Sequence, residues 1–362
     1  MSFLHGGNVY EIAARLGCGP EEILDFSASI NPLGPPPGLM EELERHFHLL
    51  QHYPDIRNEA IVHAIAEYER VPAGMVVVGN GSTELIYWLP GVLKVKSAAI
   101  VLPTFSEYRK AFELQGVRLE KLFCSRENGF QPTVEQLERV CDALAPDAVL
   151  LTNPASPAGT TLPPPVREWV LEKGCLGKPI CIVDEAFVDF CPEESFKPSL
   201  AHVPNLVLIR SMTKFYGIPG LRLGYLLASE DLAARCRASL PPWGVSTFAQ
   251  VGGVYCLRQE TYRRETLALV EEERSRLQKA FSETSGVEVF PGRANYLLLH
   301  FDGGMTSAGA LQEALLQSRR ILIRDCSTFQ GLDGRFVRVA VRLPQENQRL
   351  VEGIREWASR RA

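Results

Sequence analysis

Hydrophobic positions between residues 75 and 230 follow two alternating patterns. Short apolar runs, rich in β-branched residues or leucine, each end at a turn signal, which predicts buried strands. These runs lie at residues 75–79, 98–103, 147–154, 179–186, 205–211 and 224–229. The longer stretches between them repeat their apolar positions with the period of an α-helix. Strands that alternate with helices predict an α/β fold, with a mostly parallel sheet covered by helices on both faces.

The pattern changes after Pro242. Residues 257–284 form one long, charged helical stretch, and four short strands and a terminal helix follow it. We therefore expect a smaller α+β unit after a hinge near residues 240–250. Because residues 32–38 are rich in proline and glycine, we expect the N-terminal segment to be an ordered arm. The predicted parts are an arm at 1–40 that packs on the functional site and the small domain, a large domain at 41–245 and a small domain at 246–362.

Composition narrows the classes of partner. The 362 residues are 46% hydrophobic and 22% charged, and the net charge of -5 gives no basic surface for nucleic acid or an anionic membrane. No stretch approaches the roughly 20 apolar residues of a membrane span, and the N-terminal MSFLHGGN lacks the pattern of a signal peptide. The nine cysteines, an odd number without a CxxC pair, favour reduced thiols, so we expect a cytoplasmic protein.

Three histidines in one segment, His46, His48 and His52, raise the question of a metal site. Their offsets of two and six residues do not share one face of a helix. No carboxylate or cysteine joins them at ligand spacing. We therefore predict no metal centre there, and a solvated segment that leads to Tyr53.

The ends of the predicted strands carry the candidate chemistry, because open α/β sheets bind ligands at the carboxyl ends of their strands. After the first strand, Gly79–Gly81 predict a tight turn and Ser82 or Thr83 opens a helix, whose backbone N–H groups suit a phosphate. The same residues also fit an ordinary helix N-cap. After the second strand, Phe105 or Tyr108 suits either a planar ring or the core.

Two further strand ends carry charge. Asp184 follows four apolar residues, so its carboxylate reaches the inner end of a buried strand and needs a cationic partner or a proton. That partner is either a structural arginine or a ligand. Lys214 stands in SMTKFYGIPGLRLGY, between hydroxyl residues and Arg222. It either extends to solvent from a structural loop or forms a Schiff base with a carbonyl group.

Together these segments offer a Schiff-base lysine, a carboxylate, a flat aromatic ring and a phosphate site made of hydroxyls and an arginine. Pyridoxal phosphate requires this set, because it needs a trap for its aldehyde, an acid partner for its ring nitrogen, a ring platform and an anion site. Each signal alone has a structural alternative, such as a simple turn for residues 152–160. The conjunction predicts a pyridoxal-phosphate enzyme.

Five segments carry a family resemblance. They are DEAFVDF, SMTKFYGIPGLRLGY, HGGN at 5–8, FSASINPLG at 26–34 and RFVRVAVR at 335–342. With them the chain resembles the fold-type I pyridoxal-phosphate enzymes nearly end to end, and within these the histidinol-phosphate aminotransferase group. The last three segments look more like that group's L-threonine-O-3-phosphate decarboxylase branch, which serves cobalamin biosynthesis. The resemblance implies the fold-type I transferase fold, with a mostly parallel sheet of the seven-stranded type, a smaller α+β C-terminal domain and an N-terminal arm.

The resemblance also implies roles for single residues. Lys214 would hold the cofactor covalently and Asp184 would meet its ring nitrogen, so these two are the predicted catalytic residues. Phe105 would stack on the ring, and Ser82, Ser211 and Arg222 would hold the phosphate with the backbone of Gly81. The predicted cofactor-binding set is completed by Thr83, Asn153, Ser156, Thr213 and Tyr53, the last reaching the phosphate of the other subunit in a homodimer. The predicted substrate-binding residues are His5, Asn31, Arg324 and Arg338, with Arg338 on the substrate carboxylate.

Two positions depart from the family pattern. Where the family commonly has NPNNPTG, this chain has NPASPAG, so Ser156 replaces an asparagine that contacts the phenolic oxygen of the cofactor. A serine hydroxyl can still donate one hydrogen bond to that oxygen, but it is shorter. Phe187 stands where many aminotransferases have a tyrosine, and DEAF is common in the decarboxylase branch.

The implied reaction is decarboxylation of a small phosphorylated amino acid, L-threonine O-3-phosphate, to (R)-1-amino-2-propanol O-phosphate. The alternatives are a histidinol-phosphate or related aminotransferase and a non-catalytic homologue. Arginines that hold the substrate carboxylate perpendicular to the cofactor ring favour loss of carbon dioxide over transamination. Alternation along FVRVAVR puts Arg338 and Arg342 on the same side, which suits an anionic substrate, whereas decoration of a strand face is the structural alternative.

Overall fold

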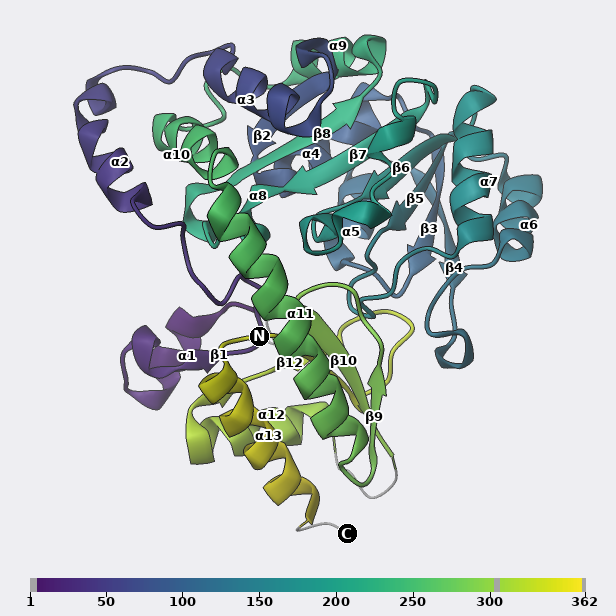
Figure 1. The fold of residues 1–362 in the computed structure, drawn as a ribbon. Helices are drawn as coiled ribbons and strands as arrows, with labels where there is room; N and C mark the ends of the chain where they lie inside the picture. The colour runs from purple at the N-terminus through teal and green to yellow at the C-terminus, as the bar shows by residue number, and fades with distance from the viewer. Residues whose placement is uncertain (1–4, 303–306, 360–362) are drawn as a thin grey trace.

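The structure is a computed structural model that describes residues 5–302 and 307–359, and it consists of two bodies (Figure 1). The larger body surrounds a seven-stranded sheet and the smaller body a four-stranded sheet. Helix α11 (Glu260–Ser282) runs from the larger body to the smaller one (Figure 1). The prediction of an α/β fold with a mostly parallel sheet and a smaller α+β unit is confirmed.

The strands of the large sheet lie in the order β2-β8-β7-β6-β5-β3-β4. They are β2 (Val76–Asn80), β3 (Ser97–Leu102), β4 (Arg118–Phe123), β5 (Ala148–Thr152), β6 (Ile180–Asp184), β7 (Leu206–Ser211) and β8 (Leu223–Ala228). β8 runs antiparallel to both of its neighbours, and the other pairs are parallel. All except β4 match predicted apolar runs. Because β4 lies at the sheet edge and has the mixed sequence RLEKLF, it lacks the apolar run that marks a buried strand.

Successive residues of the central strands are buried on opposite faces of this sheet. In β6, Ile182 packs in one layer, whereas Cys181 and Val183 pack in the other. The first layer contains α4 (Gly81–Val92), α5 (Ser106–Leu114) and α9 (Glu230–Ser239), and the second contains α3 (Glu59–Glu69), α6 (Val134–Leu144), α7 (Pro164–Cys175) and α10 (Thr247–Leu257). Burial on both faces explains why these strands are continuous apolar runs in the sequence.

The smaller body is an antiparallel sheet in the order β12-β13-β10-β9. Its strands are β9 (Val287–Phe290), β10 (Tyr296–Phe301), β12 (Arg324–Asp325) and β13 (Phe336–Ala340). Helices α12 (Ala308–Arg319) and α13 (Pro344–Ser359) and the end of α11 share one apolar core with this sheet. The predicted long charged helix and the terminal helix are therefore confirmed.

The N-terminal segment lies mainly on the smaller body (Figure 1). Helix α1 (Val9–Leu16) is followed by β1 (Leu24–Asp25), which pairs in parallel with β11 (Ile321–Leu322). The backbone then reaches the larger body, where the amide of Asn31 donates to the carbonyl oxygen of Lys214 over 2.9 Å. This segment therefore connects both bodies before α2 (Leu39–Arg45) begins.

Helix α10 packs with the larger body, since a Cβ built on Gly253 would collide with Leu223 of β8 and Ile61 of α3. The predicted boundary at residue 245 precedes this helix, and the packing of α10 favours a later transition, along α11. No helix within residues 5–302 and 307–359 is long and apolar enough to cross a membrane. All nine cysteines are free thiols, in agreement with the sequence.

Candidate active site

The order of the sheet brings the predicted polar residues to one edge. Thr152 of β5 lies opposite Asp184 of β6, and Asp184 lies opposite Ile209 of β7. Further along, Ser211 at the end of β7 lies opposite Gly224 of β8. Because parallel strands end at the same edge, residues that are far apart in the sequence become neighbours here.

Lys214 lies in the short helix α8 (Met212–Phe215), directly after β7. Its side chain is half-buried, and its Nζ donates to the Thr213 hydroxyl over 2.9 Å and to the Ser211 hydroxyl over 3.4 Å. Burial lowers the pKa of Lys214 to about 8. Repulsion from Arg222 and Arg338 also lowers this pKa, whereas attraction to Asp184 raises it. An amine that loses its proton near neutral pH can attack an aldehyde, so the Schiff-base interpretation fits better than a lysine extended to solvent.

Asp184 is buried at the end of β6, where the Ala186 amide donates to its Oδ1 over 2.6 Å and the Tyr108 hydroxyl donates to its Oδ2. Burial raises the pKa of the Asp184 carboxyl, and the bond from Tyr108 opposes that rise. Within the described ranges, 5–302 and 307–359, Asp184 forms no ion pair with an arginine or lysine. A buried carboxylate in this state suits the protonated ring nitrogen of a pyridine cofactor.

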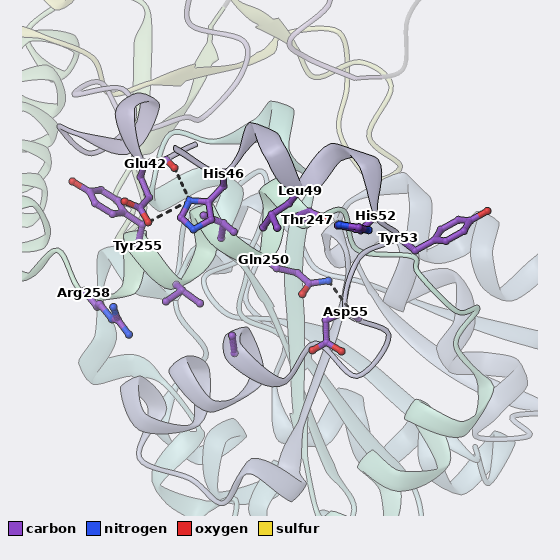
Figure 2. A pocket seen from close by; sticks show the side chains of 13 residues that line it. Glu42, His46, Leu49, His52, Tyr53, Asp55, Thr247, Gln250, Tyr255 and Arg258 are labelled. Carbon is purple, nitrogen blue, oxygen red and sulfur yellow. Dashed lines mark hydrogen bonds and ion pairs between the residues drawn. The ribbon is translucent and has the colours of Figure 1, made fainter. Parts of the chain in front are cut away.

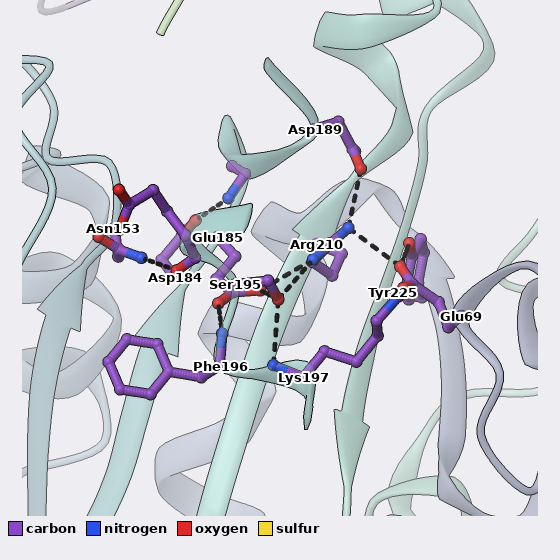
Figure 3. A network of polar contacts seen from close by, with 12 residues as sticks. Glu69, Asn153, Asp184, Glu185, Asp189, Ser195, Phe196, Lys197, Arg210 and Tyr225 are labelled. Atoms are coloured by element: carbon purple, nitrogen blue, oxygen red, sulfur yellow. Dashed lines mark hydrogen bonds and ion pairs between the residues drawn. The ribbon is translucent and has the colours of Figure 1, made fainter. Parts of the chain in front are cut away.

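The structural alternative for Asp184 was a pairing with an arginine. Such a pairing is formed by the next residue, Glu185. Arg210 donates to Glu185 over 2.8 Å and to Asp189 over 2.8 Å, and it lies 3.0 Å from Glu69 (Figure 3). Because successive strand residues point to opposite faces, Glu185 and Arg210 face away from Asp184 and Ser211. The predicted arginine partner therefore exists, but it stabilises the residue after Asp184.

Phe105 and Tyr108, the two aromatic candidates, have different environments. Phe105 precedes α5 and is half-buried, with the His5 ring 5.3 Å away. Tyr108 is buried and meets Phe105 edge-on, at 5.7 Å between ring centres and an angle of 84°. Tyr108 is thus committed to the core and to Asp184, which leaves Phe105 as the candidate to stack on a ring.

An anion site forms where α4 begins. Gly81 has a φ of 73°, and a Cβ built there would collide with the guanidinium of Arg222. A Cβ on Gly224 would likewise collide with the backbone nitrogen of Ser82. The start of a helix carries free N–H groups and a positive dipole end, and here a guanidinium lies against it. Thr83 follows in the same turn, and Ser211 supplies a hydroxyl, so these residues fit a phosphate group.

Two arginines of the small body face each other across strands β12 and β13. Arg324 lies directly opposite Arg338 in the register. Arg338 donates to the Ser156 hydroxyl over 2.9 Å and to the Ser27 carbonyl over 3.2 Å. Arg324 donates to the Thr328 hydroxyl over 2.7 Å, and burial lowers its pKa. Adjacent guanidiniums suit a substrate that carries more than one negative group.

Arg342, which the alternation pattern placed beside Arg338, has a different role. Its guanidinium makes two 3.0 Å bonds to Glu346, and it also donates to the Asp25 carbonyl over 3.1 Å. Arg342 therefore fits the structural alternative to substrate binding, and Arg324 and Arg338 remain the predicted substrate-binding arginines. The partner of Arg338 is Arg324, because β12 pairs with β13 while Arg342 lies beyond the end of that strand.

The two asparagines among the predicted binding residues, Asn153 and Asn31, form hydrogen bonds within the protein. The Asn153 side chain donates to the Glu194 carbonyl over 2.7 Å and accepts from the Leu162 amide over 2.9 Å. The Asn31 side chain donates to the Phe215 carbonyl and the Thr266 hydroxyl, and it accepts from the Leu33 amide. These bonds give both side chains a structural role, and their contacts with cofactor and substrate stay predictions. Such competition from distant backbone groups leaves no signal in a local motif.

Glu107 is a site-related residue that the sequence did not indicate. Its carboxylate lies 2.9 Å from His5, accepts a hydrogen bond from Tyr87 and lies 3.7 Å from Lys110. These contacts lower the pKa of Glu107, although burial opposes them. His5 comes from the N-terminal arm and Glu107 from α5, so the carboxylate holds the arm next to Phe105. The sequence separation of 102 positions explains why no local pattern could show this contact.

Tyr53 lies outside this group of residues. It is 79% exposed and stacks on Trp243 at 4.8 Å, at the rim of a surface pocket of about 400 Å³. Figure 2 shows Tyr53 pointing away from the other labelled side chains of this pocket. Neither Lys214 nor Asp184 lines the pocket. The exposed position is compatible with the predicted contact to another subunit, which stays a prediction.

The histidines near Tyr53 bond to the backbone. His46 and His48 contact the carbonyl oxygens of Glu42 and Arg45. In the part of the chain that the structure describes, no group of three or more histidine, cysteine, aspartate or glutamate side chains could hold a metal ion.

Comparisons with known proteins agree with the family that the residues of the site indicate. The family model described as aminotransferase class I and II matches residues 21–354. The chain is 38% identical to threonine-phosphate decarboxylase of Salmonella typhimurium, over 97% of this chain and 95% of that protein. It is similar to the crystal structure of histidinol-phosphate aminotransferase from Clostridium acetobutylicum, with a TM-score of 0.86 and 28% identity over 93% of this chain and 100% of that one. L-threonine-O-3-phosphate decarboxylase from Porphyromonas gingivalis gives a TM-score of 0.82 and 25% identity, again over 93% and 100%.

Proposed function

This chain belongs to the aminotransferase class I and II family and is a pyridoxal-phosphate-dependent enzyme, and from this premise we propose that it decarboxylates L-threonine O-3-phosphate. The observation that supports the substrate best is the pair Arg324 and Arg338, which lie opposite each other on β12 and β13. The relative with 38% identity, a threonine-phosphate decarboxylase, supports the same reaction. The product would be (R)-1-amino-2-propanol O-phosphate, for use in cobalamin biosynthesis.

The residues present fit pyridoxal phosphate. Lys214 would supply the amine, Asp184 the acid partner and Phe105 the ring platform, while Ser82, Ser211 and Arg222 would hold the phosphate. When bound, the cofactor withdraws electrons from the α-carbon of an amino acid. Asp184 would support this withdrawal by holding a proton at the ring nitrogen.

The two arginines would select the bond that breaks. Arg338 donates to Ser156 and to a backbone carbonyl of the arm, so its guanidinium is oriented before substrate arrives. We propose that Arg338 holds the carboxylate perpendicular to the ring and that Arg324, with His5, holds the phosphate. Lys214 would return a proton to the α-carbon of the substrate, because a pKa of about 8 allows both protonation states of its amine.

A histidinol-phosphate aminotransferase is the second candidate, and the structural similarity to such an enzyme favours it. The test is to supply threonine phosphate to the holoenzyme without a keto acid and to measure carbon dioxide. Stoichiometric release supports decarboxylation. No release, or release only when 2-oxoglutarate is present, overturns this proposal, and formation of glutamate from 2-oxoglutarate would then indicate transamination.

We also propose a homodimer with shared active sites. Several apolar side chains near Tyr53 are exposed in the single chain: Met40, Phe47, Leu50, Ile56 and Trp243. A surface of this kind suits a second copy of the chain. Mixing Tyr53→Ala with Lys214→Ala protein tests this, because a mixed dimer has one complete site only if Tyr53 acts in the partner. Recovery of activity is expected, and no recovery in confirmed mixed dimers contradicts the shared site.

A cytoplasmic location is the accompanying proposal. The nine free thiols, most of them buried, suit a reducing compartment. Cell fractionation with an antibody to the protein would test it.

A further inference from the structure

Tyr108 connects two functional positions and has no assigned role. It lies in the first turn of α5, with 3% of its surface exposed, and its hydroxyl donates to Oδ2 of Asp184. Its ring and that of Phe105 form a T-shaped contact with an interplanar angle of 84°. One buried side chain thus touches both the residue that would meet the ring nitrogen and the residue that would stack on the ring.

We propose that Tyr108 is a positioning residue, which keeps Asp184 ionised and oriented so that the cofactor retains a proton at its ring nitrogen. The proposal rests on the cofactor and not on the identity of the substrate. It goes beyond the predicted set, in which Tyr108 was only an alternative platform for the ring.

The hydrogen-bond inventory supports this role. Within residues 5–302 and 307–359, the Asp184 carboxylate receives hydrogen bonds only from Tyr108 and from the Ala186 amide. Burial without sufficient donors favours the protonated acid, which cannot accept a proton from a pyridinium group. Burial also raises the pKa of Tyr108 well above its usual value, so the phenol keeps its proton and remains a donor. Loss of this donor would move the shared proton from the ring nitrogen to Asp184.

Tyr108 also restrains the ring of Phe105. An edge-to-face contact restrains the rotation of both rings. Because Tyr108 is held at its hydroxyl by Asp184, the orientation of Phe105 and that of the carboxylate depend on the same side chain. A phenylalanine at position 108 would keep the ring contact and remove only the hydroxyl.

The chain offers a matched control. Tyr225 is also buried, and its hydroxyl donates to a buried carboxylate, that of Glu69. Glu69 additionally has Arg210 at 3.0 Å and Lys197 at 3.0 Å (Figure 3). Tyr225→Phe thus removes a phenol–carboxylate bond in the same domain, away from Asp184, and leaves the carboxylate with two cations.

The experiment compares holoenzymes of the wild type, Tyr108→Phe, Tyr225→Phe, Asp184→Asn and the Tyr108→Phe/Asp184→Asn double variant. Cofactor isotope-labelled at the ring nitrogen reports its protonation by NMR, titration of apoprotein gives the cofactor dissociation constant, and thermal unfolding monitors folding. For Tyr108→Phe we expect the nitrogen signal to move toward the neutral form. Cofactor binding should weaken roughly tenfold, as for a lost bond to a charged group. kcat should fall while KM changes less than about twofold, because the reacting ring is altered and the substrate arginines are not.

Two results would overturn the proposal. If Tyr108→Phe lowers thermal stability as Tyr225→Phe does and leaves the nitrogen signal and the cofactor affinity unchanged, the hydroxyl is only structural. If Tyr108→Phe has its full effect in the Asp184→Asn background, it acts by a route other than Asp184. The nitrogen signal and the cofactor affinity are both measured without a substrate, so failure of this proposal is distinguishable from failure of the decarboxylase assignment.

Discussion

At the ends of strands β6 and β7, neighbouring residues place polar and charged side chains on opposite faces of the large sheet. On one face, Asp184 and Ser211 border the site of Lys214. On the other, Glu185 and Arg210 belong to a buried network with Asp189 (Figure 3). Neighbouring residues of the same chain segments form both faces, but the two faces differ in whether their charged side chains are paired.

The network of Figure 3 neutralises its charges internally. Arg210 is 3% exposed and contacts three carboxylates within 3.0 Å, and Lys197 contacts one of them. In contrast, Lys214, Arg222 and Arg338 form no ion pairs among the residues that the structure describes. Buried charges that are paired stabilise a fold, whereas a group of unpaired cations around one space is stabilised by an anionic ligand. Five predictions, for four substitutions, test this difference between the two faces.

The largest expected effect is that of Lys214→Ala. Activity should fall to background and borohydride should no longer attach the cofactor to the protein, as measured by mass spectrometry, because the amine that forms the covalent link is gone. Wild-type protein reduced in parallel is the control. Undiminished turnover by the variant would contradict the assignment.

The same substitution should not weaken the apoprotein. Since the folded-state pKa of Lys214, about 8, lies below its ordinary value of 10.5, the charged amine opposes folding below pH 8, and this penalty fades as pH rises toward 10.5. Apo Lys214→Ala should therefore be at least as stable as the wild type in urea at pH 7, with the advantage declining at pH 10. A lower stability at pH 7 would show that Lys214 stabilises the site face.

The next effect is that of Arg210→Met, which removes the central cation of the network. The buried carboxylates it leaves behind should cost about 3–5 kcal/mol of unfolding free energy, measured by urea denaturation of the apoprotein. A loss below about 1 kcal/mol would mean that the network is not a stabilising feature.

Arg222→Met is the matched change on the site face. Because Arg222 is exposed and lacks an ion pair in the described part of the chain, apoprotein stability should change by no more than about 0.5 kcal/mol. Cofactor affinity should instead fall roughly 10- to 150-fold, the loss expected for one charge-assisted phosphate contact. Unchanged affinity would remove Arg222 from the phosphate site.

The smallest expected effect is that of Glu107→Gln, which weakens the bond that holds His5. KM for threonine phosphate should rise roughly two- to tenfold, while KM for unphosphorylated threonine should change less. Equal changes for both substrates would argue against a role of His5 at the phosphate. This prediction refines the comparison of the two faces, because Glu107 is a paired carboxylate located at the site.

Much of the fold followed from local patterns. Strands β2, β3, β5, β6, β7 and β8 were apolar runs, because burial on both faces excludes polar residues from them. The edge strand β4 was missed, since a half-exposed edge carries charges and lacks that signature. The lysine, the carboxylate and the glycine turn were recognisable because their chemistry needs particular residue types at the ends of strands.

The sequence by itself therefore determined the class of fold, the family and the residue types that bind the cofactor. Only the tertiary structure decided which polar residues are available. It paired Glu185 with an arginine and Asp184 with Tyr108, it placed Arg324 opposite Arg338, and it joined His5 to Glu107. The physical reason is that periodicity reports burial of the residue itself, whereas hydrogen bonds and ion pairs depend on the order of strands in the sheet, which brings distant segments together.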